Sequence, residues 1–216
     1  MKVAVIGASG STGRLVVERL LRDGAQVVRV VRRSSQDATG HGDVVERVGE
    51  VTSPAFLRQA LADCDAVISC LGQRRRSKSL FAARVSPPDL LQRAAAATVA
   101  AIAGGRQHLI YLSAFGVGDD LPKHALLFRA VLRMTSLKDA YADHAAAEAV
   151  IKASGATWTI LRPPGLTDDP EEVPLVDKSD RWTSFETASK RSVAAYLADC
   201  ALHRRDVGQV LTIGKG

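Results

Sequence analysis

The sequence predicts an α/β protein in which a parallel sheet of about seven strands is covered by helices on both faces. Two observations predict this class. Apolar runs of strand length alternate with amphipathic helical patterns along the chain. The first of these runs leads directly into a glycine-rich turn and then into a helical pattern. That order is typical of a doubly wound, Rossmann-type sheet.

The expected strands and helices follow one another at the spacing of β-α-β units. Strand-like runs cover residues 3–6, 27–31, 43–48, 65–71, 108–113, 157–162 and 209–213. One helical pattern follows the glycine turn, and a second begins at Ser53-Pro54. Four more cover residues 86–104, 125–134, 138–154 and 192–202. Because the ligand of such a sheet lies beyond the carboxyl ends of its strands, the segments after each strand form the candidate site.

The glycine turn is the first candidate for ligand binding. Three glycines spaced G-x-x-G-x-x-G alternate with small hydroxyl residues: Gly7, Ser9, Gly10, Ser11, Thr12 and Gly13. Backbone N–H groups at such a turn approach a phosphate closely, and the following helix N-terminus adds a favourable dipole. The same residue types also fill ordinary turns, but the strand before them and the helix after them favour a dinucleotide-binding turn.

The end of the second expected strand indicates which dinucleotide binds. Arg32 and Arg33 stand where NAD-binding proteins carry an acidic residue for the ribose 2′-hydroxyl, and no acidic residue follows before Asp37. A guanidinium forms forked hydrogen bonds to phosphate oxygens. Although surface arginines are common in a basic chain, this pair predicts NADP(H) rather than NAD(H).

Composition limits the remaining possibilities. With 216 residues, 46% of them hydrophobic, we expect one domain over residues 1–216, with residues 166–190 as a substrate-side loop or cap. The 29 Lys and Arg against 23 Asp and Glu suit an anionic cofactor or substrate. The three cysteines and the histidines lack metal-ligand spacing, so no metal site is expected. Without an apolar run of membrane length, we expect no membrane partner and a cytoplasmic protein.

Segments along nearly the whole chain carry a family likeness. Besides the glycine turn they are residues 31–33, 49–54, 65–72, 112–117, 147–148 and 154–168. In this order they resemble the atypical short-chain dehydrogenase/reductase group. Within it they resemble the small NAD(P)H-binding, NmrA-like proteins that include biliverdin and flavin reductases. Their order along the chain, rather than any single segment, is specific to this group.

The resemblance implies a role for each cofactor segment. Residues 7–13 would hold the pyrophosphate and Arg32 the 2′-phosphate, with Arg33 beside it. Glu50 and Val51 would border the adenine, although the group more often has Asp at position 50. Leu71 and Gly72 would pass under the nicotinamide ribose, Ser113 would lie beside the nicotinamide, and Pro163, Pro164 and Gly165 would close over that ring.

The chain departs from this superfamily at the catalytic tyrosine. Typical members use Tyr and Lys four residues apart, but Tyr141 is followed at that spacing by Ala145. His144 stands one helical turn before Glu148, where relatives often carry lysine. Tyr141 and His144 at i, i+3 would share a helix face and form a proton relay. The alternative, favoured because nothing else orients the pair, is that both are helix-surface residues.

These observations lead to two functional hypotheses. The first is an NADPH-dependent oxidoreductase that transfers hydride to a small conjugated acceptor (a flavin, a quinone or a bilin-like molecule), with Ser113, Tyr141 and His144 as candidate catalytic residues. Such an acceptor takes its proton from solvent. Trp182 and Phe185 would stack on a planar acceptor or pack onto the core. The second is a non-catalytic NADP(H) sensor that regulates a protein partner. We interpret the basic loop 74–78 as a solvated or anion-attracting rim rather than a nucleic-acid site.

Overall fold

The computed structural model describes residues 1–34, 42–74, 76–77, 83–118, 134–135, 137–179 and 186–216. The helix expected at residues 125–134 lies outside these ranges except for its last residue. Trp182 and Phe185 also lie outside them, as do two residues of the basic loop, Arg75 and Lys78. The interpretations of these residues therefore stay predictions.

The main sheet has eight strands and is parallel except at one edge. Its order is β3 (Val44–Val48), β2 (Gln26–Val31), β1 (Lys2–Ile6), β4 (Ala66–Ser69), β5 (His108–Leu112), β6 (Thr157–Arg162), β10 (Val210–Lys215) and β8 (Leu175–Asp177). Only β8 pairs antiparallel, with β10. The doubly wound fold is confirmed, with every expected strand in place. The sequence missed β8 because three residues are too few for a periodic pattern.

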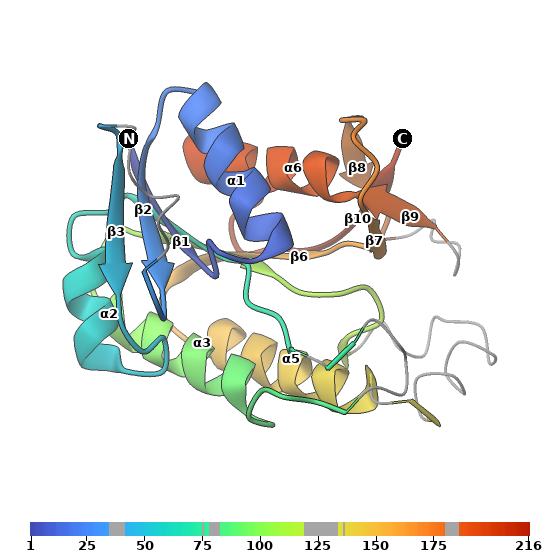
Figure 1. The fold of residues 1–216 in the computed structure, drawn as a ribbon, viewed down its shortest axis with the longest axis horizontal. Helices are drawn as coiled ribbons and strands as arrows, with labels where there is room; N and C mark the ends of the chain where they lie inside the picture. The colour runs from blue at the N-terminus through green and yellow to red at the C-terminus, as the bar shows by residue number, and fades with distance from the viewer. Residues whose placement is uncertain (35–41, 75, 78–82, 119–133, 136, 180–185) are drawn as a thin grey trace.

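Five described helices cover the two faces of this sheet (Figure 1). On one face lie α1 (Ser11–Arg22) and α6 (Lys190–His203), and on the other lie α2 (Pro54–Leu61), α3 (Leu90–Ala101) and α5 (Leu137–Lys152). The start of α2 follows the expected signal, because Ser53 Oγ accepts a hydrogen bond from the Phe56 N–H at 3.3 Å. Within the described ranges, no helix is both long enough and apolar enough to cross a membrane.

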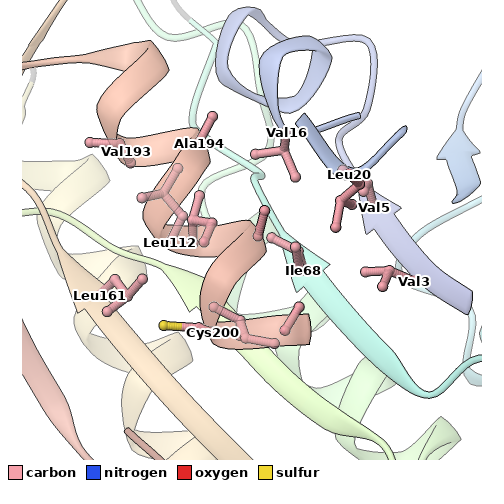
Figure 2. Packing of buried hydrophobic residues seen from close by; sticks show 14 of the residues in the cluster. Val3, Val5, Val16, Leu20, Ile68, Leu112, Leu161, Val193, Ala194 and Cys200 are labelled. Atoms are coloured by element: carbon pink, nitrogen blue, oxygen red, sulfur yellow. The ribbon is translucent and has the colours of Figure 1, made fainter. Parts of the chain in front are cut away.

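Alternating side chains of the strands divide the core into two layers. On β1, Val3 and Val5 pack toward α1 and α6, whereas Ala4 and Ile6 pack toward α2, α3 and α5. Figure 2 shows the first layer, in which side chains from α1 and α6 meet those of the sheet: Val16, Leu20, Val193, Ala194 and Cys200 against Val3, Val5, Ile68, Leu112 and Leu161. Burying each large aliphatic side chain contributes about 1.5–3 kcal/mol. This packing fixes the strand ends that build the site.

The segment expected to form a cap contains three short strands. Strands β7 (Gly165–Thr167) and β9 (Thr187–Ser189) form a separate two-stranded parallel sheet, while β8 extends the main sheet. Ser189 then caps α6, because its Oγ accepts from the Ser192 N–H at 3.1 Å. Part of residues 166–190 therefore belongs to the main sheet. A substrate-side role for the remainder stays a prediction.

Candidate functional site

The turn between β1 and α1 requires glycine at two positions. Gly7 has a φ of +82°, in the left-handed region that side chains disfavour. A Cβ atom on Gly13 would lie 2.2 Å from the Gly7 carbonyl oxygen, so only glycine lets α1 approach the strand this closely. The Gly10 N–H donates to that same oxygen at 2.9 Å. No side chain caps the first turn of α1, which begins at Ser11. Its N–H groups suit an anionic ligand.

A cleft opens from this turn across the carboxyl ends of β1, β2 and β4. The expected cofactor residues that line it are Gly7, Ser9, Gly10, Arg32, Val51, Leu71 and Gly72. Ser86 and Leu90, from the segment that enters α3, complete one side of the cleft. Residues from separate parts of the chain meet here because parallel strands end at the same edge of the sheet. The cleft lies where such folds hold a dinucleotide.

One end of the cleft adjoins a small polar pocket that we call the arginine pocket. Its lining residues are Ser9, Arg32, Arg33, Glu50 and Arg74. All three arginines are exposed, and none forms an ion pair with another described residue. Glu50, which the resemblance places beside the adenine, also lines this pocket. A phosphate dianion suits three guanidinium groups around one pocket.

Arg74 is the one residue of the arginine pocket that the sequence reasoning did not assign to the cofactor. Arg74 begins the basic loop 74–78, whose positive charge indicates an anion-attracting rim but does not identify the cofactor as the anion. Strand β1 pairs with β2 on one side and with β4 on the other. The segment that follows β4 can therefore face the segment that follows β2 across the glycine turn.

Ser113 directly follows β5 and has its hydroxyl hydrogen engaged inside the protein. Its Oγ donates to Glu148 Oε1 at 2.6 Å, and the side chain is 5% exposed. Glu148 is held in turn by Arg162, through Nε at 3.0 Å and Nη2 at 2.6 Å. Both residues are buried, and Lys152 Nζ lies 3.4 Å from the same carboxylate. Ser113 therefore retains lone pairs for a ligand, while its proton points to α5.

His144 pairs with Tyr111 rather than with Tyr141. The Tyr111 hydroxyl lies 2.9 Å from His144 Nδ1, and the two rings meet edge to face. His144 is buried, which lowers its pKa to about 4 and keeps the ring neutral. The interpretation of His144 as a helix-surface residue is thus wrong, because its side chain packs inward against β5. A Tyr141–His144 hydrogen bond is not among the contacts of the described residues.

Tyr141 is half-buried near the start of α5. Its hydroxyl forms no hydrogen bond with another described residue. Burial raises the pKa of Tyr141 to about 12, so the phenol stays protonated at neutral pH. No lysine stands four residues later to lower that pKa. The side chain can donate a hydrogen bond but is a weak acid.

The remaining expected residues lie around the neighbouring strand ends. Pro163 and Pro164 are buried between β6 and β7, and the Pro163 carbonyl accepts from the Phe115 N–H at 2.9 Å. Cys70 lines the cleft, and burial raises the pKa of its thiol to about 12, so it stays protonated. Across the residues that the structure describes, no group of three His, Cys, Asp or Glu side chains could hold a metal ion.

Curated proteins of similar sequence cover most of this chain. The chain is 25% identical over 237 residues to the divinyl chlorophyllide a 8-vinyl-reductase of Arabidopsis thaliana, covering 99% of this chain and 53% of the relative. It thus spans about half the length of that curated relative. It is 29% identical over 179 residues to an uncharacterized sugar epimerase, YhfK of Bacillus subtilis, covering 79% of this chain and 74% of the relative.

Solved structures share the fold. ChuY, an anaerobillin reductase from Escherichia coli O157:H7, superposes with a TM-score of 0.76 at 19% identity, covering 100% of this chain and 97% of its own. The NAD(P)H-binding family matches residues 7–204, from the glycine turn to the end of α6. That span includes every segment lining the cleft and the arginine pocket. The chain belongs to the NAD(P)H-binding family.

Proposed function

We propose that this protein is an NADPH-dependent oxidoreductase that transfers hydride to a small conjugated acceptor, such as a flavin, a quinone or a bilin-like molecule. The observation that carries the proposal is the continuous path from the glycine turn, through the cleft, to the arginine pocket. A dinucleotide laid along this path would place its pyrophosphate at the N-terminus of α1. Its adenosine ribose would then lie beside Arg32.

The preference for NADP(H) over NAD(H) rests on the arginine pocket. Arg32, Arg33 and Arg74 surround a space suited to one phosphate. A 2′-phosphate would form charge-assisted hydrogen bonds there, each contributing about 1.5–3 kcal/mol. NADH has only a 2′-hydroxyl at this position and would gain little from three cations.

The proposed acceptor class follows from the three candidate catalytic side chains, Ser113, Tyr141 and His144. The Ser113 hydroxyl donates its hydrogen to Glu148, and His144 Nδ1 is paired with the Tyr111 hydroxyl. Tyr141 is left as the candidate proton donor, and its pKa of about 12 makes it a poor one. Hydride transfer from NADPH to a conjugated acceptor yields an anion that solvent can protonate. Positioning of the two reactants then supplies most of the catalysis.

The names of two similar proteins are consistent with this class, since both describe reductases. The alternative, an NADP(H) sensor acting on a protein partner, is favoured by one observation. The polar groups that face inward from α5 are engaged in internal contacts, as in a protein that binds its cofactor without chemistry. Turnover separates the two functions.

The deciding experiment follows NADPH consumption with flavins, quinones and a bilin, alongside calorimetric binding of NADPH and NADH. We expect NADPH to bind more tightly than NADH and at least one acceptor to be reduced. A Tyr141→Phe variant should keep more than about a tenth of that turnover, since solvent supplies the proton.

Three results would revise the proposal. Tight NADPH binding without turnover across the panel would replace the enzyme by the sensor. Loss of turnover in Tyr141→Phe with unchanged NADPH binding would make Tyr141 an essential acid and exclude the solvent route. Failure of the wild type to bind either cofactor would contradict both functions.

A further inference from the structure

Helix α3 is capped by a carboxylate from another helix. Asp143 of α5 accepts hydrogen bonds from the N–H groups of Leu91 at 2.9 Å and Gln92 at 3.0 Å, both in the first turn of α3. Asp89, at the N-cap position of α3, makes no side-chain hydrogen bond to the helix. Asp143 is 4% exposed, so its charge is compensated by these backbone groups and by one further donor.

That further donor is Gln73, in the segment that follows β4. Its Nε2 donates to Asp143 Oδ2 at 2.5 Å and to the Pro87 carbonyl at 3.1 Å. Leu71, Gly72 and Arg74, on either side of Gln73 in sequence, line the cofactor cleft. The Gln73 side chain thus ties a cleft-lining segment to α5 while its neighbours reach the cofactor.

The segment before α3 is joined to the same structure. The Arg74 N–H donates to Ser86 Oγ at 2.7 Å, and the Arg74 carbonyl accepts from the Val85 N–H at 2.8 Å. Ser86 and Leu90 line the cleft from this segment. Residues 71–74 and 85–90 therefore form one paired wall, which we call the cleft wall. Asp143 binds Gln73 in the first part and the N–H groups of Leu91 and Gln92, which directly follow the second part.

The geometry points to Gln73 and Asp143 as positioning residues for the cofactor: their hydrogen bond, the Gln73–Asp143 latch, holds the cleft wall so that Arg74 lies in the arginine pocket. This inference rests on the proposed NADP(H) site. The Arg74 side chain is long and exposed, so its position in the pocket that Arg32 also lines depends on the backbone position of residue 74. Loosening that backbone would disperse its guanidinium over a larger volume and weaken its contact with a phosphate.

A double-mutant cycle tests the latch. The Kd values of NADPH and NADH are measured by calorimetry for the wild type, Gln73→Ala, Asp143→Asn and the double variant, together with the Tm of each protein. We expect Gln73→Ala to raise the Kd of NADPH about tenfold, the equivalent of one hydrogen bond to a charged group. The Kd of NADH should rise less, because Arg74 faces the 2′-phosphate.

Asp143→Asn should weaken NADPH binding similarly and also lower the Tm, because it weakens the cap of α3. The double variant should weaken NADPH binding by less than the sum of the two single losses, since both changes act on one contact. Asp89→Asn is the matched control, because it removes an acidic charge at the same helix start where no cap bond forms. It should leave both Kd values unchanged and the Tm nearly so, because its exposed ion pair with Arg93 contributes little to stability.

The outcomes separate the latch from the site that it serves. If the wild type binds NADPH and both single variants have the same Kd values as the wild type, the contact is only a helix cap. That result would overturn the latch but not the proposed function. Independent, additive losses would overturn it as well. If Asp143→Asn does not fold, Gln73→Ala decides, because it leaves the cap of α3 intact. Wild-type protein that binds neither cofactor would overturn the proposed function and the latch together.

Discussion

Charged side chains of the arginine pocket and of the inward face of α5 differ in exposure and in ion pairing. Arg32, Arg33 and Arg74 are exposed and form no ion pair with another described residue. On α5, by contrast, Glu148 is buried against Arg162 and Ser113. An exposed charge remains solvated without a partner, whereas a buried one requires compensation. The pocket is therefore available for a ligand, and the α5 face is committed to the fold.

Under the proposed function, this contrast would assign cofactor binding to the arginine pocket and leave α5 with little acid–base chemistry. Typical members of the dehydrogenase group that the sequence resembles use a helix after the fifth strand to hold a Tyr–Lys pair at the substrate. Here that helix uses Asp143, His144 and Glu148 for contacts inside the protein. The Gln73–Asp143 latch is where the two regions meet.

The largest expected effect is on the α5 side. Glu148→Gln removes the charge from a buried ion pair, so the free energy of unfolding should fall by about 3–5 kcal/mol in denaturant titrations. Lys152→Gln, which changes the partly exposed cation near the same carboxylate, should cost less than about 1 kcal/mol. Cofactor affinity of the folded Glu148→Gln protein should stay close to that of the wild type. A large loss of NADPH affinity in Glu148→Gln would show that the contacts of α5 also support cofactor binding.

A smaller loss of stability, with loss of binding, is expected at the glycine turn. Gly13→Ala forces a methyl group against the Gly7 carbonyl, which should destabilise the fold by about 1–3 kcal/mol and weaken NADPH and NADH alike. Gly155→Ala is the control, because an added Cβ there meets no atom within 4 Å. Calorimetry with both cofactors checks the result. Normal binding by Gly13→Ala would remove the turn from the site.

Substitution in the arginine pocket should discriminate between the cofactors. Arg32→Ala should weaken NADPH binding by about 1–3 kcal/mol and leave NADH nearly unchanged, because only NADPH carries the 2′-phosphate. Arg58→Ala, an exposed arginine on α2, should affect neither. Equal losses for both cofactors in Arg32→Ala would mean that the arginine does not contact that phosphate.

At neutral pH the smallest expected effect comes from His144, whose influence on stability appears only as the pH falls. Its pKa is lowered to about 4 by burial, so the unfolded chain, with an ordinary histidine pKa of about 6.5, binds the proton first. Stability should therefore fall as the pH drops from about 6.5 to about 4, by up to about 1.4 kcal/mol per pH unit.

The variant His144→Phe should reduce this slope in denaturant titrations at several pH values. His108, whose pKa is also lowered to about 4 by burial, should account for a remaining part. An unchanged slope in His144→Phe would show that His144 is not the titrating group.

Local pattern was sufficient for most of the fold and for several residues of the candidate cofactor cleft. The strands at residues 3–6, 27–31 and 65–71 and the glycine turn could be predicted because each depends on residues close in sequence. The structure then places Gly7, Arg32, Val51, Leu71 and Gly72 around one cleft. Strand β8 could not be predicted, because three residues define no period and its pairing with β10 is a long-range contact.

By itself, the sequence determined a doubly wound sheet, a glycine turn before the first helix and a pair of arginines after the second strand. Only the tertiary structure decided the partners of the polar side chains. Tyr111 meets His144 across 33 residues, Ser113 meets Glu148 across 35, and Gln73 meets Asp143 across 70. Hydrophobic periodicity reports which face of an element is buried. Periodicity does not report which partner a buried polar side chain contacts, because that partner depends on how distant elements pack.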